Sequence, residues 1–174
     1  ATRLISQSGL YPANCRLLDA NEALFNRVGD GSKHILILSF ESSDHALDAW
    51  LDRALEIASS AGGSYEKLQE KETEAHRTGA SGTWRNSFIR APFNRDAAVR
   101  RGIIWDTFET SITWNQGFEF IESIKDKTSK AIHEISGRET NVTCRLTHTY
   151  PDGCAPYFSY TAYATPSTML DIGK

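Results

Sequence analysis

The chain has 174 residues, of which 40% are hydrophobic, and a formal net charge of −3. This length allows one domain with a real core but not two comfortable ones. The nearly even charge argues against a general electrostatic grip on nucleic acid or on an anionic membrane, so any anion site must be local. No apolar run approaches the roughly 18 residues that span a bilayer, and the N-terminus lacks the layout of a signal peptide.

The first third of the chain predicts two strands and two helices. Residues 1–9 resemble the last turns of a helix closed by Gly9, so we expect the chain to be part of a longer protein. A strand at 15–18 is followed by Asp19 as a helix N-cap, with Glu22 as its acidic partner. Residues 34–40 are apolar on both faces, which predicts a strand in the middle of a covered sheet with a strand on each side. Residues 44–60 repeat apolar side chains at helical spacing.

The middle of the chain is rich in arginine. Residues 79–82 (GASG) predict a loop, but they lack the Lys-Ser/Thr that would follow in a phosphate loop. A five-residue step does not keep the neighbouring arginines on one helix face, which favours solubilising roles for Arg85, Arg90, Arg95, Arg100 and Arg101. Arg95 differs, because Pro92 predicts a helix break just before it. A guanidinium fixed at a helix start suits phosphate or carboxylate.

The last third predicts a strand, a long helix and two more strands. Residues 103–110 read as a strand, and Thr113 as the cap of a helix over 114–136 that ends before Gly137. The apolar residues predicted on one face of that helix are Phe118, Ile121, Ile124, Ile132 and Ile135.

Two strands then alternate cleanly. In residues 141–150, Val142, Cys144 and Leu146 share one face, and Arg145 points the other way. A turn at 151–153 leads to a strand at 157–163 that carries Tyr157. This order predicts an α+β fold with a mostly antiparallel sheet and helices packed on one face.

Few residues in these elements are candidates for chemistry. Tyr157 is either a core aromatic or an acid/base group, for which a nearby arginine would favour the phenolate. Arg16 and Arg145 lie within strands, either as edge residues or as anion ligands. The three cysteines and five histidines show no disulfide framework and no metal spacing, so we expect no metal site and reduced cysteines, which fits a cytoplasmic protein.

Five segments in register resemble a known family. They are residues 10–19, 93–96, 106–111 with Trp114, 143–150 and 156–158. Together they resemble the C-terminal half of FAD-linked oxidases of the vanillyl-alcohol oxidase type, in particular the alkyldihydroxyacetonephosphate synthase (alkylglycerone-phosphate synthase) branch. The resemblance implies that residues 1–174 form a ferredoxin-like duplicated cap domain that binds substrate. It also implies that FAD is held mainly by an N-terminal domain outside this chain.

The resemblance also implies roles for individual residues. Tyr157 matches the tyrosine that acts as acid/base beside the flavin. Arg16 and Arg95 match arginines that serve the active site, by holding the substrate's phosphate or tuning the flavin. Thr107 stands where the family shows serine, and Arg145 is a further substrate-binding candidate. No residue is assigned to bind the cofactor.

The implied chemistry has two forms. One is exchange of an acyl chain for a fatty alcohol on dihydroxyacetone phosphate; the other is hydride removal to FAD. The implied partners are a phosphate-bearing or lipid-like small molecule, the FAD-binding domain and, as a candidate, a second copy of the chain, with no nucleic acid and no transmembrane segment. The chain alone is expected to be inactive. The alternative is a free-standing ferredoxin-like module that binds a small anion or a partner subunit.

Overall fold

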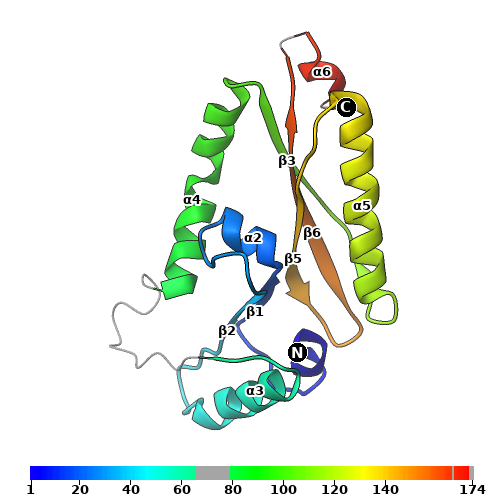
Figure 1. Cartoon of the computed structure of the whole chain (residues 1–174). Coiled ribbons are helices and arrows are strands. Elements are labelled where there is room, and N and C mark those ends of the chain that lie inside the picture. Colours follow the sequence, from blue (N-terminus) through cyan, green and yellow to red (C-terminus); the bar gives the residue numbers. More distant parts are fainter. Residues whose placement is uncertain (66–78, 166, 173–174) are drawn as a thin grey trace.

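The centre of the molecule is an open antiparallel sheet of six strands (Figure 1). The computed structural model describes residues 1–65, 79–165 and 167–172. The strands are β1 (Asn14–Leu18), β2 (Ile35–Ser39), β3 (Ile103–Glu109), β4 (Ile112–Thr113), β5 (Val142–Thr149) and β6 (Gly153–Tyr163). Their order is β2-β1-β5-β6-β3, with β4 paired to β6. The predicted α+β class and antiparallel sheet are confirmed.

The predicted position of the apolar strand in the sheet is wrong. β2 pairs with β1 and ends the strand order, so it is an edge strand within the described chain. Ile37 is buried against Trp84 and Leu18 on one face. Apolar residues on both faces show that both faces are covered, and they carry no information about a strand on the second edge.

α5 (Gly117–Ser136) covers one face of the sheet. Ile121 and Ile124 pack against buried Val142, Cys144 and Phe158. As predicted, the helix ends at a left-handed glycine, with Gly137 at φ 68°. Its start differs from the prediction, because residue 113 belongs to β4. Two residues predicted on the packed face, 118 and 135, are largely exposed because they lie in the first and last turns.

Two helices lie on the face of the sheet opposite α5. α2 (Ala20–Phe25) and α4 (Gly79–Val99) contribute Ala23 and Trp84 to a cluster with Leu18 and Ile37 on the opposite face. α3 (Asp48–Ser60) packs against α1 (Thr2–Ser6), and α6 (Met169–Ile172) lies near α5. Helices therefore flank both faces of the sheet, whereas the sequence predicts them on one.

Two predictions about α4 are wrong. Residues 79–82 are helical rather than a loop, and Pro92 lies inside the helix, which continues to Val99. Proline removes one backbone donor, and the helix resumes after it. Arg95 consequently lies near the C-terminal end of a helix and not at a helix start. Trp84, only 7% exposed, anchors this helix on the sheet, and such packing overrides weak local propensity.

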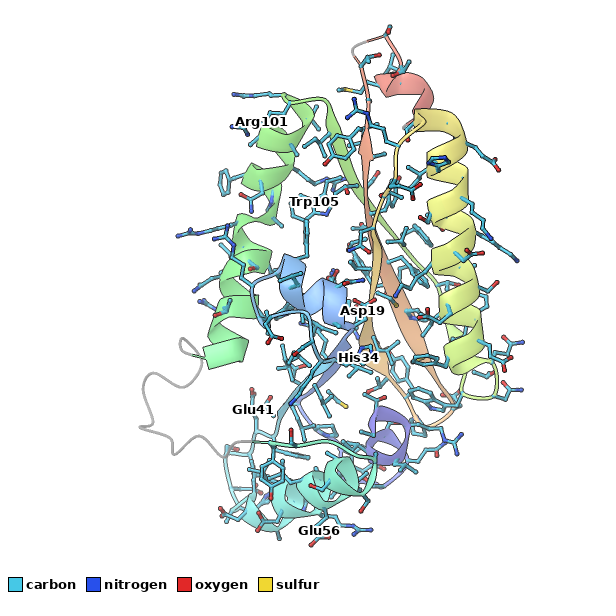
Figure 2. All side chains as sticks on the ribbon, viewed as in Figure 1. Asp19, His34, Glu41, Glu56, Arg101 and Trp105 are labelled. Atoms are coloured by element: carbon cyan, nitrogen blue, oxygen red, sulfur yellow. The ribbon has the colours of Figure 1, made fainter. Side chains whose placement is uncertain are left out.

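Asp19 joins three elements at the start of α2 (Figure 2). Its Oδ1 accepts the backbone N–H of Glu22 at 2.7 Å, which confirms the predicted N-cap. Its Oδ2 accepts the backbone N–H of Cys144 at 2.8 Å and the ammonium of Lys125 at 2.9 Å. The side chain is 13% exposed, so this one carboxylate ties β5 and α5 to the beginning of α2.

The three cysteines are free, as predicted. Burial raises the pKa of the Cys15 and Cys144 thiols, and raises that of Cys154 to about 11. Only the thiolate is nucleophilic. We therefore expect iodoacetamide at about pH 8 to modify all three thiols slowly in the folded chain and rapidly in denaturant, as measured by mass spectrometry. Rapid modification of Cys144 or Cys154 in the folded chain would contradict this packing.

Within the described ranges, no helix combines the length and apolarity needed to cross a bilayer.

Candidate functional site

Strand register brings several predicted site residues to the face opposite α5. Tyr157 of β6 pairs with Arg145 of β5. On the other side of β5, Leu18 of β1 pairs with the same arginine. Arg16 lies two residues before Leu18, so both point to the same face. Thr107 of β3 pairs with Ser159, two residues after Tyr157, which places its hydroxyl on this face as well.

Tyr157 is held at both ends of its side chain. Its hydroxyl donates a hydrogen bond to Oγ1 of Thr107 at 2.8 Å. The guanidinium carbon of Arg145 lies 3.8 Å from the centre of the tyrosine ring. That distance is within the range of a cation–π contact, so the ring is fixed under a cation while its hydroxyl is oriented by a neighbour.

A buried carboxylate fixes Arg145. Oε1 of Glu22 lies 2.5 Å from Nη1 of Arg145, and Oε2 accepts a hydrogen bond from the hydroxyl of Thr143. The Glu22 side chain is 1% exposed and that of Arg145 is 12% exposed. Both oxygens of the carboxylate are thus occupied, and the charge of Arg145 is neutralised at short range.

Arg16 lies beside this pair but is held differently. Its guanidinium carbon is 5.5 Å from the Trp84 ring, and that of Arg145 is 5.1 Å from the same ring. Burial, with the nearby charge of Arg145, lowers the pKa of Arg16. Its Nε and the Oγ1 of Thr147 are buried without a hydrogen-bond partner in the described chain. Such orphaned polar atoms mark a place where a bound group or water is needed.

These six residues form one contact network, which we call the Arg145 cluster: Arg16, Glu22, Trp84, Thr107, Arg145 and Tyr157. Four of them, Arg16, Thr107, Arg145 and Tyr157, are predicted site residues. The network draws on β1, α2, α4, β3, β5 and β6, so its members come together only in the folded chain.

Arg95, the remaining candidate, has no contact with this cluster among the described residues. The guanidinium nitrogen Nη2 of Arg95 lies 2.6 Å from Oδ1 of Asp106, and both side chains are about half exposed. Asp106 pairs with Tyr160, which packs with the residues under α5, so it points away from Thr107. Arg16 and Tyr157 are thus linked through Trp84 and Arg145, whereas Arg95 pairs with Asp106 outside the cluster.

The face around Tyr157 is partly covered. Trp105 of β3 points toward α2 (Figure 2) and meets Phe25 edge-on, with 5.0 Å between ring centres. Ser159 is only 6% exposed, whereas Tyr157 is of intermediate exposure. Tyr157 thus combines partial access with a fixed position, which a group that meets a substrate requires.

Two members of the cluster are not predicted as site residues from the sequence. Glu22 reads there only as a capping partner of Asp19, but its side chain turns to Arg145. Trp84 stands in a stretch without clear periodicity. The only signal for Glu22 is indirect: an arginine placed within a strand, such as Arg145, needs a buried counter-charge from elsewhere in the chain.

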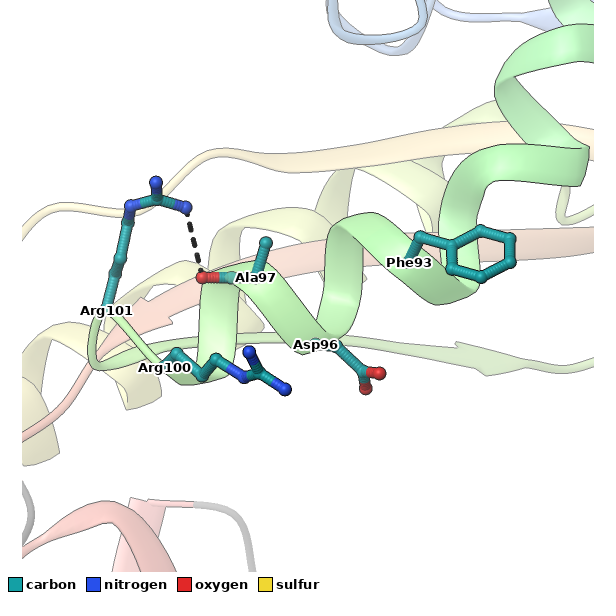
Figure 3. Close-up of a pocket in the computed structure, with 5 residues that line it drawn as sticks. All are labelled: Phe93, Asp96, Ala97, Arg100 and Arg101. Atoms are coloured by element: carbon teal, nitrogen blue, oxygen red, sulfur yellow. Dashed lines mark hydrogen bonds between the residues drawn. The ribbon is translucent and has the colours of Figure 1, made fainter.

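A hollow of about 540 Å³ lies along the C-terminal part of α4 (Figure 3). Phe93, Asp96, Ala97, Arg100 and Arg101 line it. Arg101 donates to the carbonyl of Ala97 at 3.3 Å, an ordinary way to satisfy the last turn of a helix. None of these residues belongs to the Arg145 cluster, and we assign no ligand to the hollow. No group of three or more metal-ligating side chains occurs among the described residues.

The geometry defines an α+β domain with a partly buried arginine–tyrosine site on one face of an antiparallel sheet. A family model, "FAD linked oxidases, C-terminal domain", matches residues 1–171. The chain therefore belongs to the family of FAD-linked oxidase C-terminal domains, as the sequence resemblance implies.

Individual relatives agree with this assignment. Alkyldihydroxyacetonephosphate synthase of Trypanosoma brucei brucei is 27% identical over 78 residues, which are 45% of this chain and 13% of that protein. Two solved structures of alkyldihydroxyacetonephosphate synthase, in crystal forms P1 and P212121, superpose with TM-scores of 0.72 and 0.73 at 18% identity. They cover 98% of this chain, which spans about a third of their length (36% and 35%). At this identity the structures establish the fold.

Proposed function

We propose that this domain is the substrate-binding cap of an FAD-dependent enzyme of the alkyldihydroxyacetonephosphate synthase type. The observation that carries the proposal is the fixed Tyr157, with its hydroxyl on Thr107 and its ring under Arg145. Membership of the FAD-linked oxidase family supports a flavin as the partner of this site. The flavin would be held mainly by a separate FAD-binding domain of the full-length protein.

In this proposal Tyr157 is the acid/base. A bound flavin would supply the electron sink of the reaction, and the chain would supply position and charge. Tyr157 takes or returns the substrate's proton at its hydroxyl oxygen, and Thr107 accepts the tyrosine's hydrogen bond in the resting state. A group that is held rigidly needs little reorganisation during proton transfer.

Arg16 is the proposed binding residue for the anionic group of the substrate. Its orphaned Nε and the orphaned hydroxyl of Thr147 fit an oxygen-rich group such as a phosphate or a flavin carbonyl. Arg95 remains a candidate for a second anion contact, since its guanidinium is half exposed beside Asp106. The proposal includes a substrate that bears a phosphate or is lipid-like, and a cytoplasmic location; a second copy of the chain stays a candidate partner.

Expression of the full-length protein tests this function directly. We expect a flavin absorbance spectrum and turnover of palmitoyl-dihydroxyacetonephosphate with a fatty alcohol. We also expect the isolated 174-residue chain to retain no FAD after purification, because the proposed domain contacts only the ring region. Near-stoichiometric flavin on the isolated chain, or a full-length protein without flavin, would refute the assignment.

A further inference from the structure

Arg145 differs from Arg16 because its charge is already paired with a carboxylate. Glu22 neutralises Arg145 at 2.5 Å inside the fold, and each oxygen of this carboxylate has a partner, one Arg145 and the other Thr143. Arg16 keeps an unpartnered Nε. A guanidinium that is already paired in a buried site gains little from a second anion, so Arg145 is poorly suited to bind the substrate.

The same guanidinium lies over the ring of Tyr157, with its carbon 3.8 Å from the ring centre. Glu22 comes from α2 and holds Arg145 from the side, while the hydroxyl of Tyr157 is directed by Thr107 on β3. Three strands and a helix thus set the place of one phenol. Rigid support of this kind decides whether a reacting group sits within a fraction of an ångström of its productive position.

We propose that Arg145, locked by Glu22, is a positioning residue for Tyr157 rather than a ligand of the substrate. The inference rests on the proposed role of Tyr157, and it replaces the substrate-binding role predicted for Arg145. Arg145 touches neither substrate nor flavin in this account. It acts by holding the tyrosine.

The test uses Arg145→Lys in the full-length protein, with palmitoyl-dihydroxyacetonephosphate as the probe. Lysine keeps the charge and a donor for Glu22 but loses the planar group that stacks on the ring. A misplacement of about 1 Å can cost about 100-fold in rate. We expect kcat to fall by about that factor, with the dissociation constant for the probe, measured by flavin absorbance, unchanged.

Two further variants complete the comparison. Glu22→Gln keeps the shape and acceptor oxygen but not the charge, so it should lower kcat in the same direction, and it carries the test if Arg145→Lys does not fold. Arg138→Lys is the matched control, because Arg138 lies 5.4 Å from the ring of Tyr163, is exposed, and is outside the cluster. It should leave both constants at wild-type values.

A spectroscopic measurement separates this inference from the proposed function. In protein labelled with fluorotyrosine, the fluorine NMR signal of Tyr157, identified by its loss in Tyr157→Phe, should shift in Arg145→Lys and Glu22→Gln but not in Arg138→Lys. A weakened probe affinity with kcat retained, wild-type constants, or an unmoved fluorine signal would overturn the positioning role. Absence of turnover in the wild type would instead reject the proposed function. The fluorine signal would then still show whether Arg145 and Glu22 hold the ring of Tyr157 in place.

Discussion

Tyr157→Phe in the full-length protein is expected to lower kcat by roughly 10² to 10⁴-fold, the usual contribution of a general acid or base. The substitution removes one hydroxyl and its hydrogen bond to Thr107, and it keeps the ring that Arg145 covers. Flavin content should be unchanged, because the proposed FAD-binding domain is untouched. Steady-state turnover and the flavin spectrum of the purified variant measure the two effects separately.

Tyr160→Phe is the matched control for this experiment. Tyr160 lies on the same strand, but its side chain packs with the cluster under α5, on the opposite face of the sheet. The same atom is removed from the same strand, so a general loss of stability would affect both variants. Wild-type turnover in Tyr157→Phe, or equal losses in the two variants, would remove Tyr157 from the reaction.

Glu22→Ala is expected to lower the free energy of unfolding of the chain by about 3–5 kcal/mol, the effect of breaking a buried ion pair. The carboxylate is 1% exposed and the Arg145 side chain 12%, so the substitution leaves a guanidinium that water reaches poorly. The hydroxyl of Thr143 loses its acceptor as well. The urea midpoint, converted with the slope of the transition, gives the value.

An exposed ion pair provides the contrast. Asp126→Ala breaks the pair with Lys130 at 2.7 Å, where both side chains are more than half exposed, and should change stability by no more than about 0.5 kcal/mol. Combining Glu22→Leu with Arg145→Met removes both buried charges. This double variant should be more stable than Glu22→Ala. If Glu22→Ala lowered the free energy of unfolding no more than Asp126→Ala, the buried ion pair would not stabilise the fold as expected.

Local patterns in the sequence predicted much of the fold. Alternation in residues 142–149 identified which side chains of β5 face α5, and Gly137 marked the end of that helix. Asp19 was predicted as an N-cap and is one. These features depend on residues close together in the chain, so short-range stereochemistry is enough to predict them.

Long-range packing decided where the remaining elements lie. Pro92 and the glycines at 79 and 82 argue locally against a helix, yet α4 runs through them with Trp84 buried on the sheet. β2 is apolar on both faces but lies at the edge of the sheet. In α4 a contact with residues far away in the sequence outweighs a local preference of about 1–3 kcal/mol, and in β2 the apolar pattern does not specify how many strands lie beside it.

The sequence by itself determined the family, the α+β class and the candidates Tyr157, Arg16 and Arg145. Only the tertiary structure decided that Glu22 neutralises Arg145, from 123 residues away in the chain. Only the tertiary structure separated Arg95 from the cluster, by pairing it with Asp106. The physical reason is that a buried charge must be balanced within a few ångströms of space, while the sequence records only distances along the chain.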